Sequence, residues 1–187
     1  VHNLEKNLDN IEKKGIEMLE NWDGSYSKDE ASPLIFEELY INLAKNLAKD
    51  ELGDSLINLF MGKRIMVRNI IDQCLEDNAE WIDDVSTPEK KETLSEIIEV
   101  SYRKTISELE EKGGSDPEKW KWGEHHKLTL KHPLSEKKIL DRLFKLNKGP
   151  YSVGGSYHTV CPYSYSYNNP YEVNHGASHR HIYNLDN

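Results

Sequence analysis

Apolar side chains recur at helical spacing from the first residues of the chain. They lie three to five positions apart, and the stretch "NWDGSY" at 21–26 then interrupts the pattern with Asp-Gly. This pattern predicts a first helix that ends near Asn21. Its apolar face would carry Leu4, Leu8, Ile11, Ile16 and Leu19.

A second, longer amphipathic helix is predicted to begin near residue 32. Ser32 is expected to be its N-cap, and Pro33 suits the first turn, where a missing N–H costs nothing. Leucines at 34, 39, 43 and 47 share one face, so the helix should run to about Leu52 and end at Gly53. Residues 57–79 continue a helical pattern.

A further helix is predicted between residues 86 and 114. Ser86 or Thr87 would cap it, Pro88 would lie in its first turn, and acidic residues come early, where the helix dipole favours them. Gly113-Gly114 should end it, because glycine readily adopts the backbone conformation that follows a helix. The first two-thirds of the chain, residues 1–114, is therefore predicted to be helical.

The pattern changes after Gly114. One short charged helix is indicated over "SEKKILDRLFKLN", and the alternating stretches 156–160 and 179–185 predict strands separated by turns. Residues 115–187 should thus be a mixed strand and loop part, which makes the fold class α+β. Two or three short strands do not form a stable sheet alone, so partner strands are expected from outside this chain.

Composition and charge narrow the classes of function. The chain has 187 residues, 36% hydrophobic and 30% charged, within the range of one globular domain or a piece of a larger one. A net charge of −9 argues against nucleic acid as a partner, and the absence of an 18-residue apolar run argues against a membrane span. Because the chain begins at Val1 inside a helical pattern, without an initiator Met, we expect a processed product or an excised fragment.

Two cysteines, Cys74 and Cys161, lie too far apart for a zinc knuckle or a CxxC redox pair. They could form one disulfide or stay as two thiols, and neither alternative identifies the cellular compartment of the protein.

The histidines near the end of the chain raise the question of a metal site. His175 and His179 would share a face only in a helix, whereas His179 and His181 would share one only in a strand. These geometries exclude each other, so polar strand residues are the better interpretation. His125-His126 lacks the spacing of HExxH zinc enzymes and favours structural or surface histidines. We predict no metal and no cofactor in this chain.

Other polar stretches have ordinary explanations. The acidic residues at 77–84 and 108–111 lack the spacing of a calcium loop and suit a solvated face. The glycine pairs at 113–114 and 154–155 lack the context of a phosphate loop, and no GxSxG elbow or SxxK pair marks a nucleophile. The tyrosines of "CPYSYSYNNPY" could form a binding platform, although an ordinary loop or edge strand is favoured.

Four longer stretches occur in order along the chain: "LENWDGSYSKDEASPLIFEELYINLAKNLAKDELGD" (19–54), "WKWGEHHKLTLKHPL" (120–134), "GGSYHTV" (154–160) and "HGASHRHIYNLD" (175–186). Together they resemble the C-terminal part of the penicillin acylase (penicillin amidase) family of N-terminal-nucleophile hydrolases. We take the motif residues as structural. They are Trp22, Asp23, Gly24, Trp122, Gly123, His132, Pro133, His175, Gly176, Ser178 and Arg180.

The resemblance implies an activity. Members are precursors that cut themselves into two chains and expose an N-terminal serine, which attacks an amide carbonyl while its own α-amine acts as general base. Penicillins, glutaryl-cephalosporins and N-acyl homoserine lactones are substrates of the family. No catalytic residue carries over: Val1 is not a nucleophile, and the segments around the family's serine and oxyanion asparagine are expected upstream. This chain would then be the C-terminal portion of the large (beta) chain.

The resemblance also implies a fold and partners. The helices would form one layer of a four-layer αββα sandwich, and the tail would add strands to a sheet built mostly by the alpha chain and the N-terminal part of the beta chain. An isolated fragment should expose apolar surface and self-associate. Many members are exported, so a periplasmic or extracellular parent agrees with the resemblance, but the sequence does not assign a location.

Two alternatives belong to other classes of function. The first is a non-catalytic helical interaction module with a Tyr-rich docking tail, and the weaker second is a histidine-based metalloprotein. In the closing stretch the strand period puts Ser178 and Arg180 on one face, and Arg180 is expected to be a partly buried residue that orders its surroundings through several hydrogen bonds.

Overall fold

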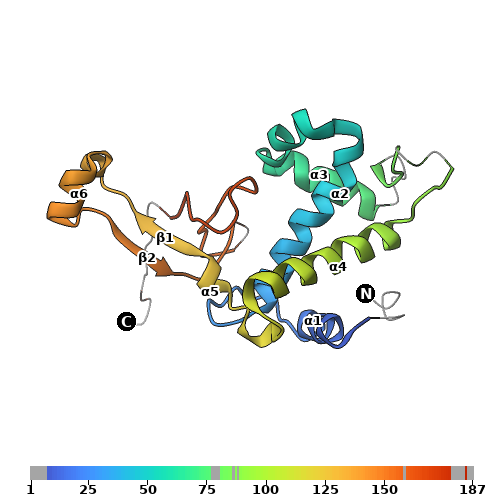
Figure 1. The fold of residues 1–187 in the computed structure, drawn as a ribbon, viewed down its shortest axis with the longest axis horizontal. Coiled ribbons are helices and arrows are strands. Elements are labelled where there is room, and N and C mark those ends of the chain that lie inside the picture. Colours follow the sequence, from blue (N-terminus) through green and yellow to red (C-terminus); the bar gives the residue numbers. More distant parts are fainter. Residues whose placement is uncertain are drawn as a thin grey trace.

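Helix α2, Ser32–Met61, is the longest element, and the other long helices pack around it (Figure 1). In this computed structural model the described residues are 8–76, 81–85, 87, 89–157, 159–177 and 184. Helix α2 contacts α1 (Asn10–Glu20), α3 (Arg64–Leu75) and α4 (Leu94–Gly113). Apolar side chains fill the space between these helices, including Leu34, Ile35, Leu47, Val67 and Ile106.

Helix α2 differs from the prediction at both its start and its end. Ala31 is the N-cap, so the prediction of Ser32 is wrong; Ser32 is the first helical residue, and its hydroxyl donates to the carbonyl of Met18 at 3.1 Å instead. The predicted end at Gly53 corresponds to a break with φ 63° and ψ 179°, after which the helix resumes and runs to Met61. Gly53 does interrupt the helix as predicted, but the helix continues beyond it, and Phe60 and Met61 near its end are buried in the core.

Helix α4 begins later than predicted. Its N-cap is Thr93, whose hydroxyl accepts from the amide of Glu96 while the Glu96 carboxylate accepts from the amide of Thr93. The prediction of Ser86 or Thr87 is therefore wrong, since the T-x-x-E capping box at 93–96 satisfies two helix-end donors. The predicted end is confirmed: Gly113 is the last helical residue and Gly114 follows with φ 80°.

Polar pairs also link the long helices inside the core. The Asn42 amide of α2 donates to the hydroxyl of Thr105 on α4 at 3.1 Å, and both residues are buried. The Tyr102 hydroxyl of α4 donates to the carbonyl of Glu12 on α1. Because each buried donor has an acceptor, these contacts fix how the helices are aligned without leaving polar groups unsatisfied.

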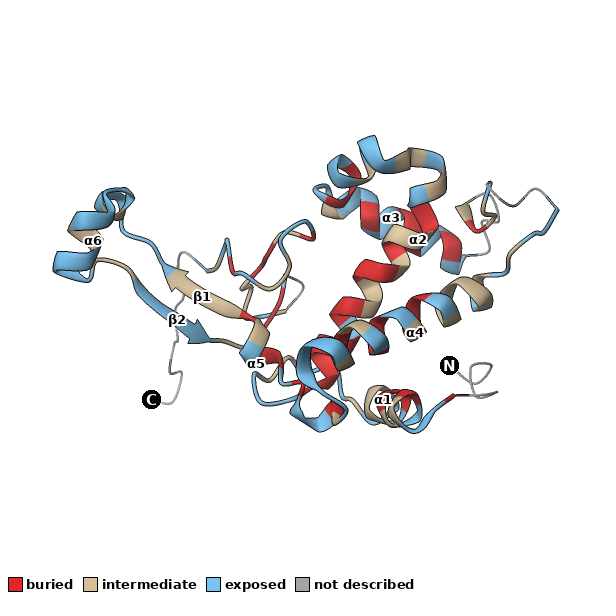
Figure 2. Ribbon diagram, viewed as in Figure 1, coloured by how far each residue is buried: buried red, intermediate tan, exposed pale blue. Residues whose placement is uncertain are grey.

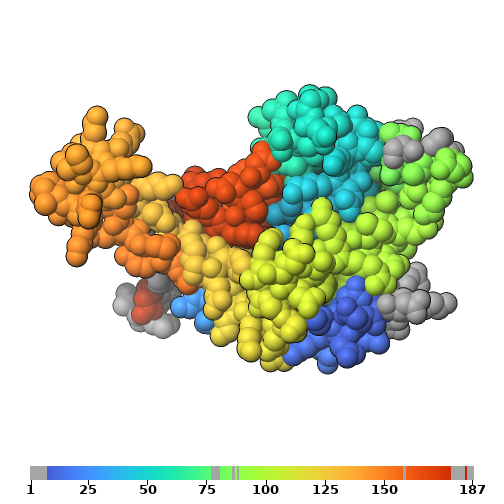
Figure 3. Space-filling view, in the orientation of Figure 1, coloured from blue at the N-terminus to red at the C-terminus, as the bar shows by residue number. Residues whose placement is uncertain are grey.

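The C-terminal part contains a two-stranded antiparallel sheet. After the short helices η2 (Pro117–Lys119) and α5 (Trp122–His125), strand β1 (Lys127–Leu130) pairs with β2 (Lys148–Ser152), with Lys127 opposite Ser152. Between the strands lie η3 (Pro133–Glu136) and α6 (Lys138–Phe144). Residues 127–152 form an arm that projects from the helices, and the C-terminal segment lies between the two (Figures 1 and 3).

The α+β class is confirmed, but the strands were misplaced. Residues 156–160 form no strand in the described positions, and the second strand is instead β2, Lys148–Ser152, where no strand was predicted. The predicted strand at 179–185 lies outside the described residues, apart from Asn184. The four-layer αββα sandwich is not formed by the described part of the chain, whose one sheet has two strands, and it stays a prediction.

Much of the arm is exposed (Figure 2). All five residues of β2 are exposed, and apolar side chains on the neighbouring helices face solvent, including Leu134, Ile139, Leu143 and Phe144. These apolar side chains belong to η3 and α6 rather than to the strands, so a sheet that continues in another part of the protein stays a prediction. Self-association stays a prediction. Among the described residues no helix is both long and apolar enough to cross a membrane.

The cap of α4 can be tested with two neighbouring substitutions. Thr93→Ala should lower the free energy of unfolding by about 1 kcal/mol, because it removes the side-chain acceptor of the capping box. Urea unfolding followed by circular dichroism would measure it. Ser95→Ala, at an exposed position two residues further on, is the control and should change stability little; equal losses in both variants would contradict the assignment of the cap.

Candidate functional site

Three of the four motif stretches meet at one place, called here the motif junction: residues 22–30, Trp122–His126 and 153–156. The amides of Trp122 and Gly123 donate to the carbonyls of Glu30 and Lys28, both at 2.8 Å. From the third stretch, the amide of Gly155 donates to the carbonyl of Tyr26 at 2.8 Å. Backbone hydrogen bonds thus join segments that lie 92 to 129 positions apart in the sequence.

The Trp22-Asp23-Gly24 motif forms a turn at the edge of the junction. The Trp22 indole donates to the carbonyl of Ser25 at 2.7 Å, and the Asp23 carboxylate accepts from the amide of Ser25 at 2.7 Å. This backbone hydrogen bond is the largest cause of the lowered pKa of Asp23. Gly24 has φ 82°, a conformation that side chains with Cβ rarely adopt.

Trp122 occupies the centre of the motif junction. Its side chain is fully buried, and its indole N–H donates to the carbonyl of Gly155 at 2.9 Å. The rings of Tyr26 and Tyr171 meet it edge-on, with centroids 5.9 and 5.8 Å away, and His126 stacks on it at 4.5 Å. This indole therefore connects the N-terminal helices, α5 and the C-terminal segment.

The predicted histidine pair is structural. His126 is fully buried, and its Nδ1 lies 3.1 Å from the carbonyl of Tyr171, which only a protonated Nδ1 can satisfy. Burial lowers the pKa of His126 to about 4, so the ring is neutral near pH 7. His125 is half-buried against Tyr171.

A buried carboxylate lies beside the junction. Glu37 of α2 is 6% exposed; it accepts from the hydroxyl of Ser156 at 2.6 Å and from the hydroxyl of Tyr165, and Tyr26 lines a cavity together with it. Arg64 of α3 lies over the other side of this group, with its guanidinium 5.1 Å from the centre of the Tyr165 ring. We call these residues (Tyr26, Glu37, Ser156 and Tyr165) the Glu37 cluster.

The Glu37 cluster was missed by the sequence analysis. A signal did exist: Glu37 falls on the face of α2 that also carries Leu34 and Ile41, so a carboxylate was placed toward the core. Its partners could not be inferred, because Ser156 and Tyr165 lie 119 and 128 positions away.

The remaining motif residues lie elsewhere. His132 is at the distal end of the arm, where its Nδ1 accepts from the amide of Leu134 at 3.1 Å ahead of Pro133. The carbonyl of His175 accepts from the amide of Ser164, and Gly176 packs so closely on the Tyr163 ring that a Cβ would lie 2.9 Å from it. Ser178 and Arg180 lie outside the described residues, as do His179 and His181, so their predicted roles stay predictions.

The Tyr-rich stretch is largely turned inward. Tyr165 and Tyr167 are 1% and 4% exposed, and both pack on other aromatic rings. A docking tail needs accessible rings, so this burial argues against the interaction-module alternative. Groups of three or more metal-ligating side chains are not found among the described residues. Cys74 and Cys161, both in the described part, are not joined by a disulfide.

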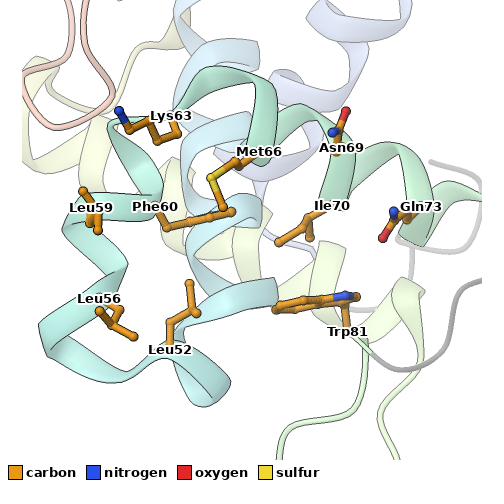
Figure 4. A pocket seen from close by; sticks show the side chains of 10 residues that line it. All are labelled: Leu52, Leu56, Leu59, Phe60, Lys63, Met66, Asn69, Ile70, Gln73 and Trp81. Atoms are coloured by element: carbon orange, nitrogen blue, oxygen red, sulfur yellow. The ribbon is translucent and has the colours of Figure 1, made fainter.

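An apolar cavity of about 470 Å³ lies between the two helices α2 and α3 (Figure 4). Leu52, Leu56, Leu59 and Phe60 line one side of it, Met66 and Ile70 reach in from α3, and Trp81 closes one end. Its polar lining consists of Lys63, Asn69 and Gln73. The cavity offers apolar contact area and contains no hydroxyl or thiol nucleophile among its lining residues.

Comparison with known proteins decides the family. The model of the family described as penicillin amidase matches residues 1–187, the whole chain. The chain belongs to the penicillin amidase family. A search of curated proteins found no match to an individual protein.

Membership in the penicillin amidase family supports an acylase or amidase type of function. Within the described residues, the nearest approach to a nucleophile and base is Ser156 with Glu37. Ser156 is 2% exposed and its hydroxyl is committed to the carboxylate at 2.6 Å, so a substrate carbonyl has no path to it. The pair therefore anchors the C-terminal segment to α2, a structural role within this penicillin amidase chain.

The close packing of the motif junction can be tested with a pair of glycines. A Cβ on Gly155 would lie 2.1 Å from the carbonyl oxygen of Cys161, whereas one on Gly24 meets nothing within 4 Å, although both have positive φ. Gly24→Ala should cost about 1–2 kcal/mol from backbone conformation alone, and Gly155→Ala should cost at least about 2 kcal/mol more. Thermal unfolding would compare them; similar losses would contradict the packing described.

The buried His126 should make stability fall in acid. Its folded pKa of about 4 lies below the ordinary value of 6.5, so between these values the unfolded chain binds a proton that the folded chain does not. Stability is full above pH 6.5 and should decline by up to about 1.4 kcal/mol per pH unit down to pH 4. In His126→Phe this part of the decline should disappear, as urea titrations at a series of pH values would show; identical pH slopes would contradict it.

Proposed function

We propose that this chain is the C-terminal portion of the large chain of an N-terminal-nucleophile amidase that hydrolyses a linear N-acyl amide bond. The observation that carries the proposal is the family match over residues 1–187. The catalytic serine lies outside this chain, in the part of the parent that precedes it. The chain acts as scaffold and contributes no catalytic residue.

The chemistry of the parent follows from its nucleophile. The N-terminal serine hydroxyl attacks the amide carbonyl and passes its proton to its own α-amine, and backbone and asparagine donors stabilise the oxyanion. The amine product leaves with that proton, and water then hydrolyses the acyl-enzyme. Penicillins, cephalosporin side chains and acyl-homoserine lactones are the substrate types that the family resemblance suggests.

The position of exposed apolar side chains supports a partner chain. The arm offers the wholly exposed strand β2 and apolar residues on α6, including Ile139 at 80% exposure. Exposing such an apolar surface to water is unfavourable in free energy, and burying it against another chain is favourable. We propose that the remainder of the precursor, the alpha chain and the N-terminal part of the beta chain, covers it and pairs with the exposed strand.

The test is an activity assay on two proteins. The full-length parent should release amine from a panel of N-acyl substrates, and changing the serine at the start of its large chain to alanine should abolish turnover. The purified 187-residue chain should be inactive on the same panel.

Two outcomes would overturn the proposal. One is measurable amide turnover by the purified 187-residue chain, which would put the nucleophile inside it. The other is an intact parent, with its serine exposed by self-cleavage and confirmed by mass spectrometry, that hydrolyses no amide in the panel.

A further inference from the structure

A second cavity, distinct from the apolar one, opens between α2, α3 and the C-terminal segment beside the Glu37 cluster. Its volume is about 430 Å³, within the range of small-molecule sites. We call it the aromatic cavity. It is lined by Tyr26, Phe36, Glu37, Tyr40, Arg68, Asp72 and Tyr167.

Four of the seven lining residues are aromatic, and three of them follow one another closely around the wall. The centroids of Phe36 and Tyr40 are 6.3 Å apart, and those of Tyr40 and Tyr167 are 5.9 Å apart. Trp22 stands behind Phe36 at 5.4 Å. Aromatic faces carry partial negative charge, so rings grouped around a space favour a cation within it.

The lining also includes an anionic group with no cationic partner. Glu37 takes part in none of the ion pairs recorded among the described residues; its carboxylate is held by hydroxyl groups instead. A carboxylate offers about four acceptor positions, and the hydroxyl groups of Ser156 and Tyr165 leave room for further donors. An ammonium ion in the cavity would fill such a position.

The exposed rim adds a second carboxylate. Arg68, the one cation among the lining residues, donates from Nε to the Asp72 carboxylate at 3.2 Å, so its charge is already engaged. The pKa of Tyr40 reports the resulting field: it is raised by burial first and then by Asp72 and Glu37, which outweigh the opposite effects of Arg68 and Arg64.

The same tyrosines already hold one cation. The guanidinium of Arg64, which does not line the cavity, is centred 4.6 Å from the ring of Tyr157 and 4.3 Å from that of Tyr167. The rings of Tyr157, Tyr165 and Tyr167 therefore already surround one delocalised cation in this structure. The rings of Tyr26, Phe36 and Tyr40 carry no such cation among the described contacts, and they face the aromatic cavity.

We propose that the aromatic cavity is a binding site for a small organic ammonium ion, with its methyl or methylene groups against the rings of Tyr26, Phe36 and Tyr40 and its charge toward Glu37. The site does not depend on the proposed amide chemistry, since every residue of it belongs to this chain.

The test compares the binding of a cation with that of an uncharged isostere. Choline and 3,3-dimethylbutan-1-ol have nearly the same shape, but the second has carbon in place of the charged nitrogen. Isothermal titration of each into the 187-residue chain, and into the mature parent, should show choline binding at least tenfold tighter. Phenylacetate, an aromatic anion, should not bind.

Substitutions then assign the site. Phe36→Leu keeps an apolar side chain but removes one aromatic face, and should weaken choline binding about 2- to 30-fold. The same change in the exposed Phe144 of the arm is the matched control and should leave binding unaltered. Glu37→Gln should weaken binding tenfold or more while keeping an acceptor for the tyrosine hydroxyls.

Several binding results would overturn the proposal. Equal binding of choline and the alcohol, tighter binding of phenylacetate, no choline binding, or a Phe36→Leu variant that binds as well as Phe144→Leu would each overturn the proposal. If circular dichroism shows that Glu37→Gln does not fold, the Phe36→Leu and Phe144→Leu pair decides. An inactive parent that still binds choline through Phe36 would refute the amidase proposal alone.

Discussion

The burial of one indole ring holds the two parts of this chain together. Trp122 is fully buried at the motif junction, where its N–H has a single suitable acceptor, the carbonyl of Gly155. A ring of this size in a closed site excludes water from everything around it, and its N–H must then be satisfied within the protein. The loop after α1, the short helix α5 and the turn at 153–156 are shaped by that requirement. Gly123 and Gly155 allow the close packing there, because a Cβ on Gly123 would lie 2.7 Å from the side chain of Lys28 and one on Gly155 would lie 2.1 Å from the carbonyl oxygen of Cys161.

Burial of polar groups at the same place has consequences for ionisation. His126 lies against Trp122 and is held neutral, because the environment that shelters the indole disfavours a charged imidazole. Glu37 is equally buried but keeps several hydroxyl donors. The difference lies in the partners. A second proton on His126 would sit on Nε2, which is buried with no hydrogen-bond acceptor among the described residues, whereas hydroxyl groups donate hydrogens to the Glu37 carboxylate. The same region of the structure thus contains His126, a base that resists protonation, and Glu37, a carboxyl group that already accepts hydrogen bonds from hydroxyl groups.

This arrangement explains why motif residues of a hydrolase family can be structural. Tryptophan and glycine at the motif junction join segments from opposite ends of the chain, and their replacement would separate the helices from the arm. The family match and the geometry are consistent with a scaffold that presents the arm, with its exposed strand and apolar helix, to other parts of an enzyme. The aromatic cavity is lined by Tyr26 and Glu37 of the Glu37 cluster and by no residue of the arm.

The sequence by itself determined the helices, because their signals are local. Apolar spacing, a glycine that stops α4 and the glycine that breaks α2 each act within one or two turns, and the resemblance carried by Trp22, Trp122 and Gly176 identified the family. The sequence-based prediction was wrong where two local signals competed: S-T-P at 86–88 suggested the N-cap of α4, but T-x-x-E at 93–96 forms it.

Only the tertiary structure decided the strands and the candidate site. Residues 156–160 alternate like a strand, yet the positive φ of Gly155 and the bond from Ser156 to Glu37 hold their start in a turn. Lys148–Ser152 was not predicted to be a strand, yet it pairs with β1. Contacts between residues a hundred positions apart leave no trace in local spacing, since they depend on which surfaces the folded helices bring together.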